Sequence, residues 1–353
     1  MSSMTMRERI LAVIEGRPHD QIPLVMYENM LPHDEIYPLL GPEGIGLLRW
    51  TKIHRIEQRE CASEIKEYYV EGMRWQRTTI HTPKGDLVEE RAFEPVYDSS
   101  SVRKHFVEER GDYERFWAFL EDGQIVSDPE PYERAVRELG DLGLPLVSID
   151  RTPYQQLWVE WMGLDNLGYH MADYADRVAH TVDLLKARAE RTFEIARNCP
   201  SPFIDFPDNI TAPAIGPRRF SQYCVPLYDR LADMLDERDA RVFVHMDGDL
   251  KPLWPAIAAS KVGGLDSFAP APDNDTTVDQ AVEMWPEKRL FINFPSSVHL
   301  RSPEEIREVT DKMLTAGGHT GRLEIQISEN VPPDVWRTSM PVIAQALIDF
   351  GAP

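Results

Sequence analysis

The stretch from Phe203 to Asp247, FIDFPDNITAPAIGPRRFSQYCVPLYDRLADMLDERDARVFVHMD, decides the fold class. It begins with a short apolar run at 203–206, continues through a helical pattern at 218–238, and returns to an apolar run at 241–246. Polar residues follow each apolar run at once. Two short buried strands joined by a helix of this length form a βαβ unit, which is the building block of a parallel sheet.

The same rhythm extends in both directions from this stretch. Further short apolar runs occur at 22–26, 144–149, 264–268, 290–294 and 323–327, and helical patterns occur at 132–139, 153–198, 252–259, 277–285, 303–316 and 333–350. The chain is therefore expected to have an α/β fold with a parallel sheet. A doubly wound sheet has the same rhythm, but no GxGxxG motif follows the first strand, which disfavours the dinucleotide-binding version.

Residues 66–93 have a different pattern. Tyr68, Trp75 and Ile80 lie in β-rich segments, and the sequence Pro83-Lys84-Gly85-Asp86 is typical of a turn. This pattern predicts an antiparallel hairpin inserted before the regular part of the fold. Because no low-complexity tract, long linker or internal repeat interrupts the chain, we expect residues 1–353 to form a single domain.

The charge of the chain limits its partners. Its 38 Lys and Arg residues against 59 Asp and Glu residues give a net charge of −21 at neutral pH. This charge repels phosphate backbones and anionic membrane surfaces, so we expect neither nucleic acid nor a membrane as a partner. A small-molecule substrate is the expectation that remains.

The cysteines and the start of the sequence bear on the compartment. Cys61, Cys199 and Cys224 stand far apart and form no CxxC motif, which favours reduced thiols. The first residues, MSSMTMRERILAVIEGR, contain charges throughout and no continuous apolar stretch, so they resemble neither a signal peptide nor a membrane span. We therefore expect a cytoplasmic protein.

Polar side chains follow the apolar runs on six of the predicted strands. They are Tyr27, Glu28 and Asn29; Asp205, Asp208 and Asn209; His245 and Asp247; Asp266; Asn293; and Gln326, Glu329 and Asn330. A single such residue is about as often a helix N-cap as a functional group. Their repetition at equivalent positions favours a functional site, because in a parallel barrel the strand ends meet at the face that carries the active site.

Several stretches resemble one known superfamily. MTMRERILAVIEGRPHDQIPLV at 4–25 is similar to the first helix and strand of uroporphyrinogen decarboxylase superfamily members. FIDFPDNITAPAIGPRRFSQYCVPLYDRL at 203–231 resembles their central strand, loop and following helix, and VFVHMDGDLKPL at 242–253 resembles a strand that ends in histidine. Residues 289–350 resemble their closing βαβα unit. The resemblance implies a single (β/α)8 TIM barrel, with the hairpin at about 66–93 as an elaboration.

The superfamily includes decarboxylases, corrinoid- or folate-linked methyltransferases and cobalamin-independent methionine synthase. Uroporphyrinogen decarboxylase itself has an arginine-rich motif after the first strand, where this chain has MYENMLPHD at 26–34. Its substrate bears eight carboxylates, which Glu28, Asp34 and Glu35 would repel. The resemblance therefore points to the superfamily and away from the haem-pathway decarboxylase.

The methyltransferase branch of this superfamily holds zinc with an H-x-C motif and a later cysteine. Here the corresponding residues are His245 and Asp247, followed by Glu329 in SENVPP. A His/Asp/Glu set can hold zinc with one open position, and it suits an oxygen ligand better than a thiol. In the alternative interpretation, His245 is a hydrogen-bonding substrate contact and Asp247 caps the next helix.

These observations lead to one preferred function and two alternatives. The preferred function is transfer of a methyl group between a small O-, N- or S-methyl compound and a corrinoid or tetrahydrofolate carrier, with zinc as a Lewis acid. Since no DxHxxG corrinoid signature is present, a corrinoid would arrive free or on a separate corrinoid protein. In the first alternative, the chain is a metal-independent decarboxylase of a small non-porphyrin acid, in which Asp205 or His245 protonates the carbanion. In the second, it is a non-catalytic ligand-binding barrel.

Each predicted site residue has a role under the preferred function. The catalytic residues are Glu28, Asp205, Asp208 and His245; the substrate-binding residues are Tyr27, Asn209, Asp266, Asn293 and Gln326; and the metal ligands are His245, Asp247 and Glu329.

Overall fold

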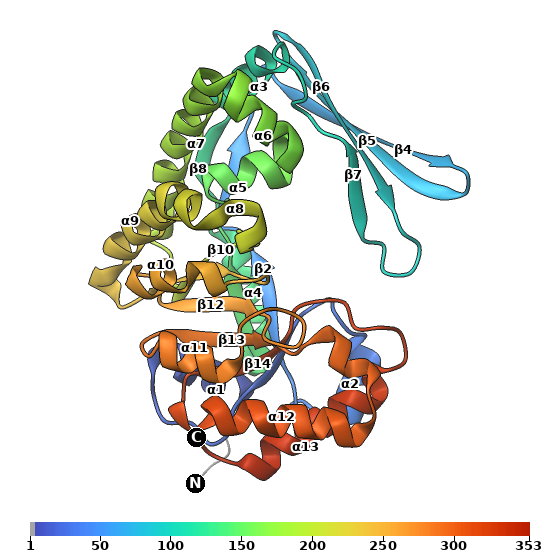
Figure 1. Ribbon diagram of the computed structural model, residues 1–353, viewed down its shortest axis with the longest axis vertical. Helices are drawn as coiled ribbons and strands as arrows, with labels where there is room; N and C mark the ends of the chain where they lie inside the picture. Colours follow the sequence, from blue (N-terminus) through green and yellow to red (C-terminus); the bar gives the residue numbers. More distant parts are fainter. Residues whose placement is uncertain (1–3) are drawn as a thin grey trace. The chain divides into compact units, whose positions relative to one another are not determined.

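The computed structural model describes residues 4–353 (Figure 1). These residues form two compact units. The first unit contains the chain up to Ile53, Pro129–Ile149 and Ala196–Pro353, and the second contains His54–Asp128 and Asp150–Ile195.

The first unit is built on an eight-stranded parallel sheet, in the order β10-β11-β12-β13-β14-β1-β2-β9. Its strands are β1 (Leu24–Tyr27), β2 (Gly46–Thr51), β9 (Gly143–Val147), β10 (Phe203–Phe206), β11 (Arg241–His245), β12 (Gly264–Phe268), β13 (Arg289–Asn293) and β14 (Leu323–Ile327). A parallel bridge between Ser148 and Asp205 joins the two end strands, so the sheet closes into a barrel. The predicted (β/α)8 barrel is confirmed.

Helices follow the barrel strands along the chain. They are α1 (Met6–Glu15), α2 (His33–Leu40), α4 (Glu130–Leu139), α8 (Ala212–Arg219), α9 (Val225–Leu235), α10 (Trp254–Ala259), α11 (Val278–Met284), α12 (Pro303–Gly317) and α13 (Trp336–Phe350). A π-helical turn at Phe220–Cys224 separates α8 from α9. The predicted helix at 218–238 is thus part of a longer helical segment with a change of hydrogen bonding near its start.

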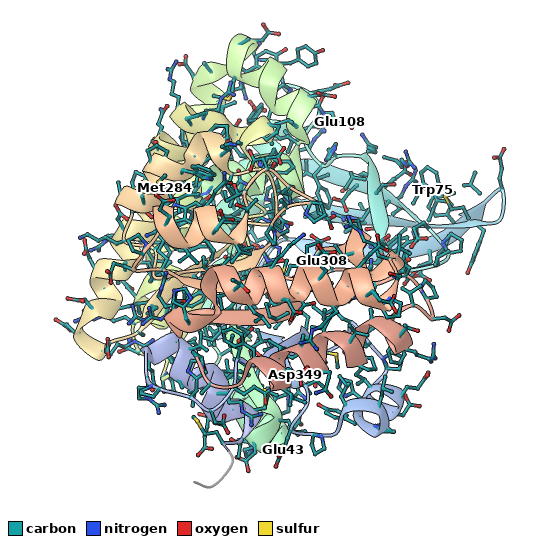
Figure 2. All side chains as sticks on the ribbon, turned by 60° about the horizontal axis from the view of Figure 1, so that its bottom comes forward. Glu43, Trp75, Glu108, Met284, Glu308 and Asp349 are labelled. Atoms are coloured by element: carbon teal, nitrogen blue, oxygen red, sulfur yellow. The ribbon has the colours of Figure 1, made fainter. Side chains whose placement is uncertain are left out.

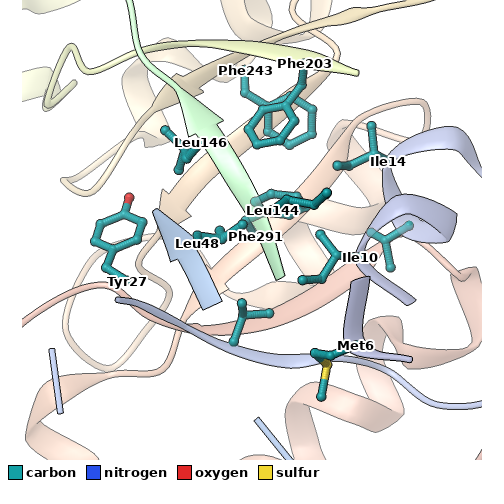
Figure 3. Packing of buried hydrophobic residues seen from close by; sticks show 12 residues of the cluster. Met6, Ile10, Ile14, Tyr27, Leu48, Leu144, Leu146, Phe203, Phe243 and Phe291 are labelled. Atoms are coloured by element: carbon teal, nitrogen blue, oxygen red, sulfur yellow. The ribbon is translucent and has the colours of Figure 1, made fainter. Parts of the chain in front are cut away.

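The barrel interior is a packed apolar core. Phe203, Phe243 and Phe291 point inward from three strands, and the ring of Phe243 lies 5.0 Å from that of Phe203 and 4.7 Å from that of Phe291, between centroids (Figure 3). The apolar stripe of α1 packs against the same cluster through Ile10 and Ile14. The core therefore fills the barrel, as in other closed parallel barrels, and leaves the strand ends for function.

Helix α1 begins and ends where its sequence predicts. The Thr5 hydroxyl accepts a hydrogen bond from the Glu8 amide, and the Glu8 carboxylate accepts one from the Thr5 amide, which completes a capping box. Gly16 ends the helix in the left-handed conformation with φ of 75°.

The second unit contains the antiparallel part of the chain. Its strands are β3 (His54–Glu57), β4 (Ala62–Val70), β5 (Met73–Thr82), β6 (Gly85–Phe93), β7 (Ser100–Lys104) and β8 (Gln124–Ser127), and its helices are α3 (Asp112–Asp122), α5 (Pro153–Gln156), α6 (Leu164–Asp173) and most of α7 (Ala175–Ala196). Strands β4 to β7 form one four-stranded sheet, and β3 pairs with β8 (Figure 1). The predicted hairpin is present, with β5 and β6 joined at Thr82 and Gly85.

This antiparallel sheet is larger than the predicted hairpin. A tight turn at Glu71 and Gly72, both with positive φ, adds β4, and a longer connection adds β7. Within residues 4–353, no helix combines the length and apolar composition that crossing a membrane requires.

Candidate active site at the carboxyl end of the barrel

Four predicted site residues meet through their side chains at the ends of β1, β11, β12 and β14. Tyr27 is the last residue of β1 and His245 is the last residue of β11, while Asp266 and Gln326 lie inside β12 and β14. All four are buried. Parallel strands in a barrel end on the same side, which brings residues so far apart in sequence into one cluster.

Asp266 is the acceptor at the centre of this cluster. The Tyr27 hydroxyl donates to its Oδ2 at 2.5 Å, His245 Nδ1 lies 3.0 Å from the same oxygen, and Gln326 Nε2 donates to Oδ1 at 3.1 Å. The Tyr27 hydroxyl also lies 3.1 Å from His245 Nδ1. Since Asp266 is fully buried, these donors stabilise its carboxylate in place of water.

A second carboxylate faces the other ring nitrogen of His245. Nε2 lies 3.3 Å from Asp247 Oδ2, and Asn209 Nδ2 donates to the same Asp247 oxygen at 2.8 Å. Burial alone would lower the pKa of His245, but its hydrogen bonds to Asp247 and Asp266 and their charges raise it to about 10. In turn, His245 and Asn209 hold the pKa of Asp247 below its usual value, although burial acts in the opposite direction. The imidazole is therefore a cation at neutral pH and donates from both nitrogens.

The two sides of this cation differ in access to solvent. The Asp266 side chain is fully buried, whereas the Asp247 side chain is 23% exposed and the imidazole 10% exposed. Trp50, in β2, is partly exposed, and its ring centroid lies 5.1 Å from that of Tyr27 and 6.2 Å from that of His245. A ligand would thus approach His245 from the Nε2 side, beside an aromatic ring.

Two more carboxyl groups lie inside the barrel. Asp205 in β10 and Glu324 in β14 are fully buried, and none of their carboxyl oxygens has a hydrogen-bond partner among the residues that the structure describes. Burial raises the pKa of Asp205 well above its usual value, with a further contribution from the charge of Asp266. Burial likewise raises the pKa of Glu324.

The remaining predicted residues have other partners. Glu28 forms a two-point ion pair with Arg49, with both N···O distances at 2.6 Å. The Tyr228 hydroxyl donates to buried Asp208 at 2.5 Å. The side-chain oxygen of Asn293 accepts hydrogen bonds from the backbone amide and the hydroxyl of Ser328. These contacts bring Glu28, Asp208 and Asn293 into supporting interactions rather than into contact with His245.

Glu329 lies in the loop after β14 and is exposed. Partial desolvation raises the pKa of its carboxyl, and so does the charge of Asp247, while His245 lowers it. Glu329 is therefore close enough to Asp247 and His245 to interact with their charges.

The predicted zinc ligands do not fit a metal ion in this arrangement. Within residues 4–353, no three His, Cys, Asp or Glu side chains are disposed to hold one metal. His245 has a carboxylate at each ring nitrogen, and an imidazolium has no lone pair to give a metal. The assignment of His245, Asp247 and Glu329 as zinc ligands stays a prediction: in this arrangement the aspartate at position 247, where the H-x-C motif has a metal-binding thiolate, accepts a hydrogen bond from His245.

Sequence reasoning missed two residues of this site. Trp50 lies on β2, the barrel strand that the sequence did not predict, so its position near a strand end could not be recognised. Glu324 precedes Gln326 by two residues and points to the same side of β14. The sequence did contain a signal for Glu324, because it is an acidic residue that alternates with apolar residues in a buried strand.

Comparisons with known proteins bear on this site. The family model described as uroporphyrinogen decarboxylase (URO-D) matches residues 194–344, which include β10 to β14 and hence His245, Asp266 and Gln326. No curated protein matches the chain.

Solved structures show the fold. A methyltransferase from Methanosarcina mazei aligns with a TM-score of 0.58 at 13% identity, over 99% of each chain. The chitinase ChiB of Flavobacterium johnsoniae aligns at 0.35 and 9% identity, over 64% of this chain and 82% of its own. The pneumococcal virulence factor StrH aligns at 0.40 and 8% identity, over 96% of this chain and 86% of its own. The first match supports the barrel fold along the whole chain, and likenesses as low as the other two carry no argument.

The family match covers β10 to β14 but not β1 and β2, which carry Tyr27 and Trp50, and the structural alignment supports the same fold over 99% of the chain. Over residues 194–344, less than half of its length, this chain is similar to the uroporphyrinogen decarboxylase family.

Proposed function

We propose that this chain is an enzyme that moves a methyl group between a small methylated compound and a corrinoid or folate carrier. The observation that carries the proposal is the buried His245 cation, hydrogen-bonded to a carboxylate at each ring nitrogen, of which Asp247 at Nε2 is partly exposed. The family match over residues 194–344 and the methyltransferase of the same fold support an enzyme of this type.

The chemistry needs a proton source at the leaving group. When a nucleophile takes the methyl carbon, the electron pair of the bond between carbon and the leaving atom goes to that atom. The leaving atom then takes the proton from His245 Nε2, and the imidazole becomes neutral. Tyr27 and Asp266 hold the ring by its other nitrogen, so that Nε2 keeps its orientation during the transfer.

The basicity of His245 selects among the candidate substrates. A proton held with a pKa of about 10 passes readily to an alkoxide or an amine. It passes poorly to a thiolate, whose conjugate acid has a pKa of ~8.5. The site therefore favours O-methyl and N-methyl compounds over S-methyl compounds. Trp50 would stack on the substrate, and the corrinoid or folate carrier, when bound, would accept the methyl group.

The same proton source favours one second candidate, the metal-independent decarboxylase. Loss of CO2 leaves a carbanion, which takes a proton from His245 Nε2 without any methyl carrier. The misfit of the predicted metal ligands is compatible with this reaction as well.

One experiment separates these functions. The purified protein is incubated with a panel of 13C-methyl ethers and amines together with a reduced corrinoid or tetrahydrofolate, and 13C NMR follows the label. A parallel panel of 13C-carboxylates reports CO2 release. Label on the carrier supports methyl transfer, and CO2 release without label transfer supports decarboxylation. Saturable binding without either product would leave a non-catalytic barrel and contradict the proposal.

A matched pair of histidine variants shows whether the activity belongs to this site. His245→Gln should abolish the reaction. His81→Gln changes an exposed histidine paired with Asp86 and should leave it unchanged.

A further inference from the structure

A cavity of about 390 Å³ lies at the end of the barrel opposite the site of His245. Arg289 is the first residue of β13, Arg322 directly precedes β14, and His19 precedes β1, so the cavity lies at the amino ends of these strands. Its lining residues are Gly16, Arg17, Pro18, His19, Arg289, His319, Thr320, Gly321, Arg322 and Pro353. This lining has three arginines, two histidines and no acidic side chain, in a chain with a net charge of −21.

Arg289 has unused hydrogen-bond donors at this cavity. Its Nε donates to the Ile14 carbonyl at 3.3 Å, and its two terminal nitrogens have no acceptor among residues 4–353. A Cβ added at Gly16 would collide with Nη2, so the glycine leaves room for the guanidinium at the cavity wall. Arg241 Nε already donates to the same Ile14 carbonyl at 2.8 Å, so ending helix α1 does not require Arg289.

Arg289 and Arg322 lie close to one another, and neither forms an ion pair with a carboxylate among residues 4–353, whereas Arg17 pairs with Glu15. Burial lowers the pKa of Arg289, and the charges of Arg241 and Arg322 lower it further, while only Glu287 acts in the opposite direction. Arg322 Nη1 donates to the backbone carbonyls of Trp285 and Lys288, which satisfy its hydrogen bonds but do not cancel its charge. Like charges held together in this way are costly unless an anion joins them.

His19 adds an unpartnered buried atom to the lining. The residue is 7% exposed, and its Nδ1 lies 3.1 Å from the Arg17 carbonyl, which accepts a hydrogen bond from it. With the proton on Nδ1, Nε2 is an acceptor, and this atom has no partner among the described residues. Burial lowers the pKa of His19, which keeps the ring neutral. An oxyanion that still carries a proton would satisfy Nε2.

We propose that this cavity binds a small oxyanion of the phosphate class, either free phosphate or the phosphate group of a small molecule. Arg289 binds the oxygens through its two terminal nitrogens, the charge of Arg322 adds to the attraction, and His19 Nε2 accepts a hydrogen bond from the hydroxyl of a hydrogen phosphate. The fork of a guanidinium matches two oxygens of such an anion. This site is separate from the proposed methyl transfer, because the strands place it at the other end of the barrel.

Titration calorimetry with inorganic phosphate tests the proposal, at constant ionic strength set with chloride because simple screening would otherwise mimic binding. Arg289→Gln should weaken phosphate binding by about tenfold or more, the loss expected for a charged two-point contact. The matched control is Arg307→Gln on α12, an arginine that already pairs with Asp311 and Asp349. Its sequence neighbour Glu308 lies on the outer side of α12 (Figure 2), and Arg307→Gln should leave phosphate binding unchanged.

Additional variants and ligands identify the bound anion and keep the test valid if one variant misfolds. If Arg289→Gln fails to fold, Arg289→Lys, which keeps the charge and removes the two-point fork, should still weaken binding severalfold. Sulfate, which carries no proton at neutral pH, should bind more weakly than phosphate. If glycerol phosphate binds as tightly as inorganic phosphate, the site is assigned to a phosphorylated small molecule. If glycerol phosphate binds more weakly, the site is assigned to free phosphate.

Three results would overturn the proposal. The first is no binding by the unmodified protein at about 1 mM phosphate. The second is an equal loss in Arg289→Gln and Arg307→Gln. The third is binding only after two residues are added beyond Pro353, which would mean that the carboxylate of this residue occupies the cavity.

Discussion

His245 Nδ1 lies 3.0 Å from Asp266 Oδ2, and these two residues are also direct partners in the register between β11 and β12. Parallel pairing therefore sets their separation, and the barrel backbone holds the ion pair. Asp247, two residues after His245, completes the arrangement from the loop. A cation fixed between two carboxylates on adjacent segments is a proton donor that needs little reorganisation.

The Tyr27→Phe variant tests whether the Tyr27 hydroxyl holds the His245 ring in its orientation. The change removes a hydroxyl that donates to Asp266 and lies beside Nδ1, so the ring loses part of its orientation. We expect turnover to fall by about 10- to 100-fold with a small change in KM and an unchanged fold. Steady-state kinetics measure this, with exposed Tyr69→Phe as the control. Equal kinetics for Tyr27→Phe and the unmodified protein would exclude a positioning role for the hydroxyl.

Metal content is a second test. Because both nitrogens of His245 are engaged by carboxylates, the protein should contain well under one zinc per chain, and activity should survive a chelator. Elemental analysis before and after chelation, with activity followed in parallel, provides the measurement. Stoichiometric zinc that leaves together with activity would restore His245, Asp247 and Glu329 as ligands.

Glu324 predicts a pH dependence of stability. Burial raises the pKa of this carboxyl in the folded protein, whereas in the unfolded chain it titrates near the ordinary pKa of about 4.3. The contribution of Glu324 to stability is therefore fully present below that pH and falls as pH rises toward the raised pKa of the folded state. In Glu324→Gln this loss should disappear, so the variant should gain stability relative to the unmodified protein as pH rises.

Urea unfolding at a series of pH values measures this difference. Exposed Glu304→Gln on α12 is the matched control and should follow the unmodified protein. Parallel curves for Glu324→Gln and the unmodified protein would mean that the folded protein does not keep Glu324 neutral.

Limited proteolysis tests the prediction that the chain forms a single domain. If residues 1–353 fold as one domain, cleavage in the exposed turns of the β4 to β7 sheet should leave the remainder resistant, and thermal unfolding should show one transition. Release of a stable, independently folding half with a boundary near residue 128 would contradict it.

The sequence predicts most of the fold because barrel strands buried on both faces are short apolar runs. Runs such as 203–206 and 290–294 coincide with strands almost to the residue. Strand β2 was missed because GLLRWT at 46–51 contains Arg49 and the partly exposed Trp50, which interrupt the run. Only its parallel pairing with β1 and β9 identifies it as a strand.

For the site, sequence reasoning predicts which residues lie at strand ends but not which partners they have. Tyr27, His245 and Asp266 were expected together, and they are in contact. Glu28 was expected at the same end, yet its carboxylate pairs with Arg49 on the unpredicted strand β2. Partner choice depends on side-chain direction and register, which strand patterns alone do not specify.

The protonation of His245 tests the central claim most directly. Nitrogen-15 NMR of protein labelled at histidine, with His245→Gln used to assign the signals, reports whether each ring nitrogen carries a proton. At about pH 8, where a histidine with the ordinary pKa of ~6.5 is neutral, we predict that both nitrogens of His245 are protonated. A neutral ring at that pH, with one nitrogen lacking a proton, would contradict the account.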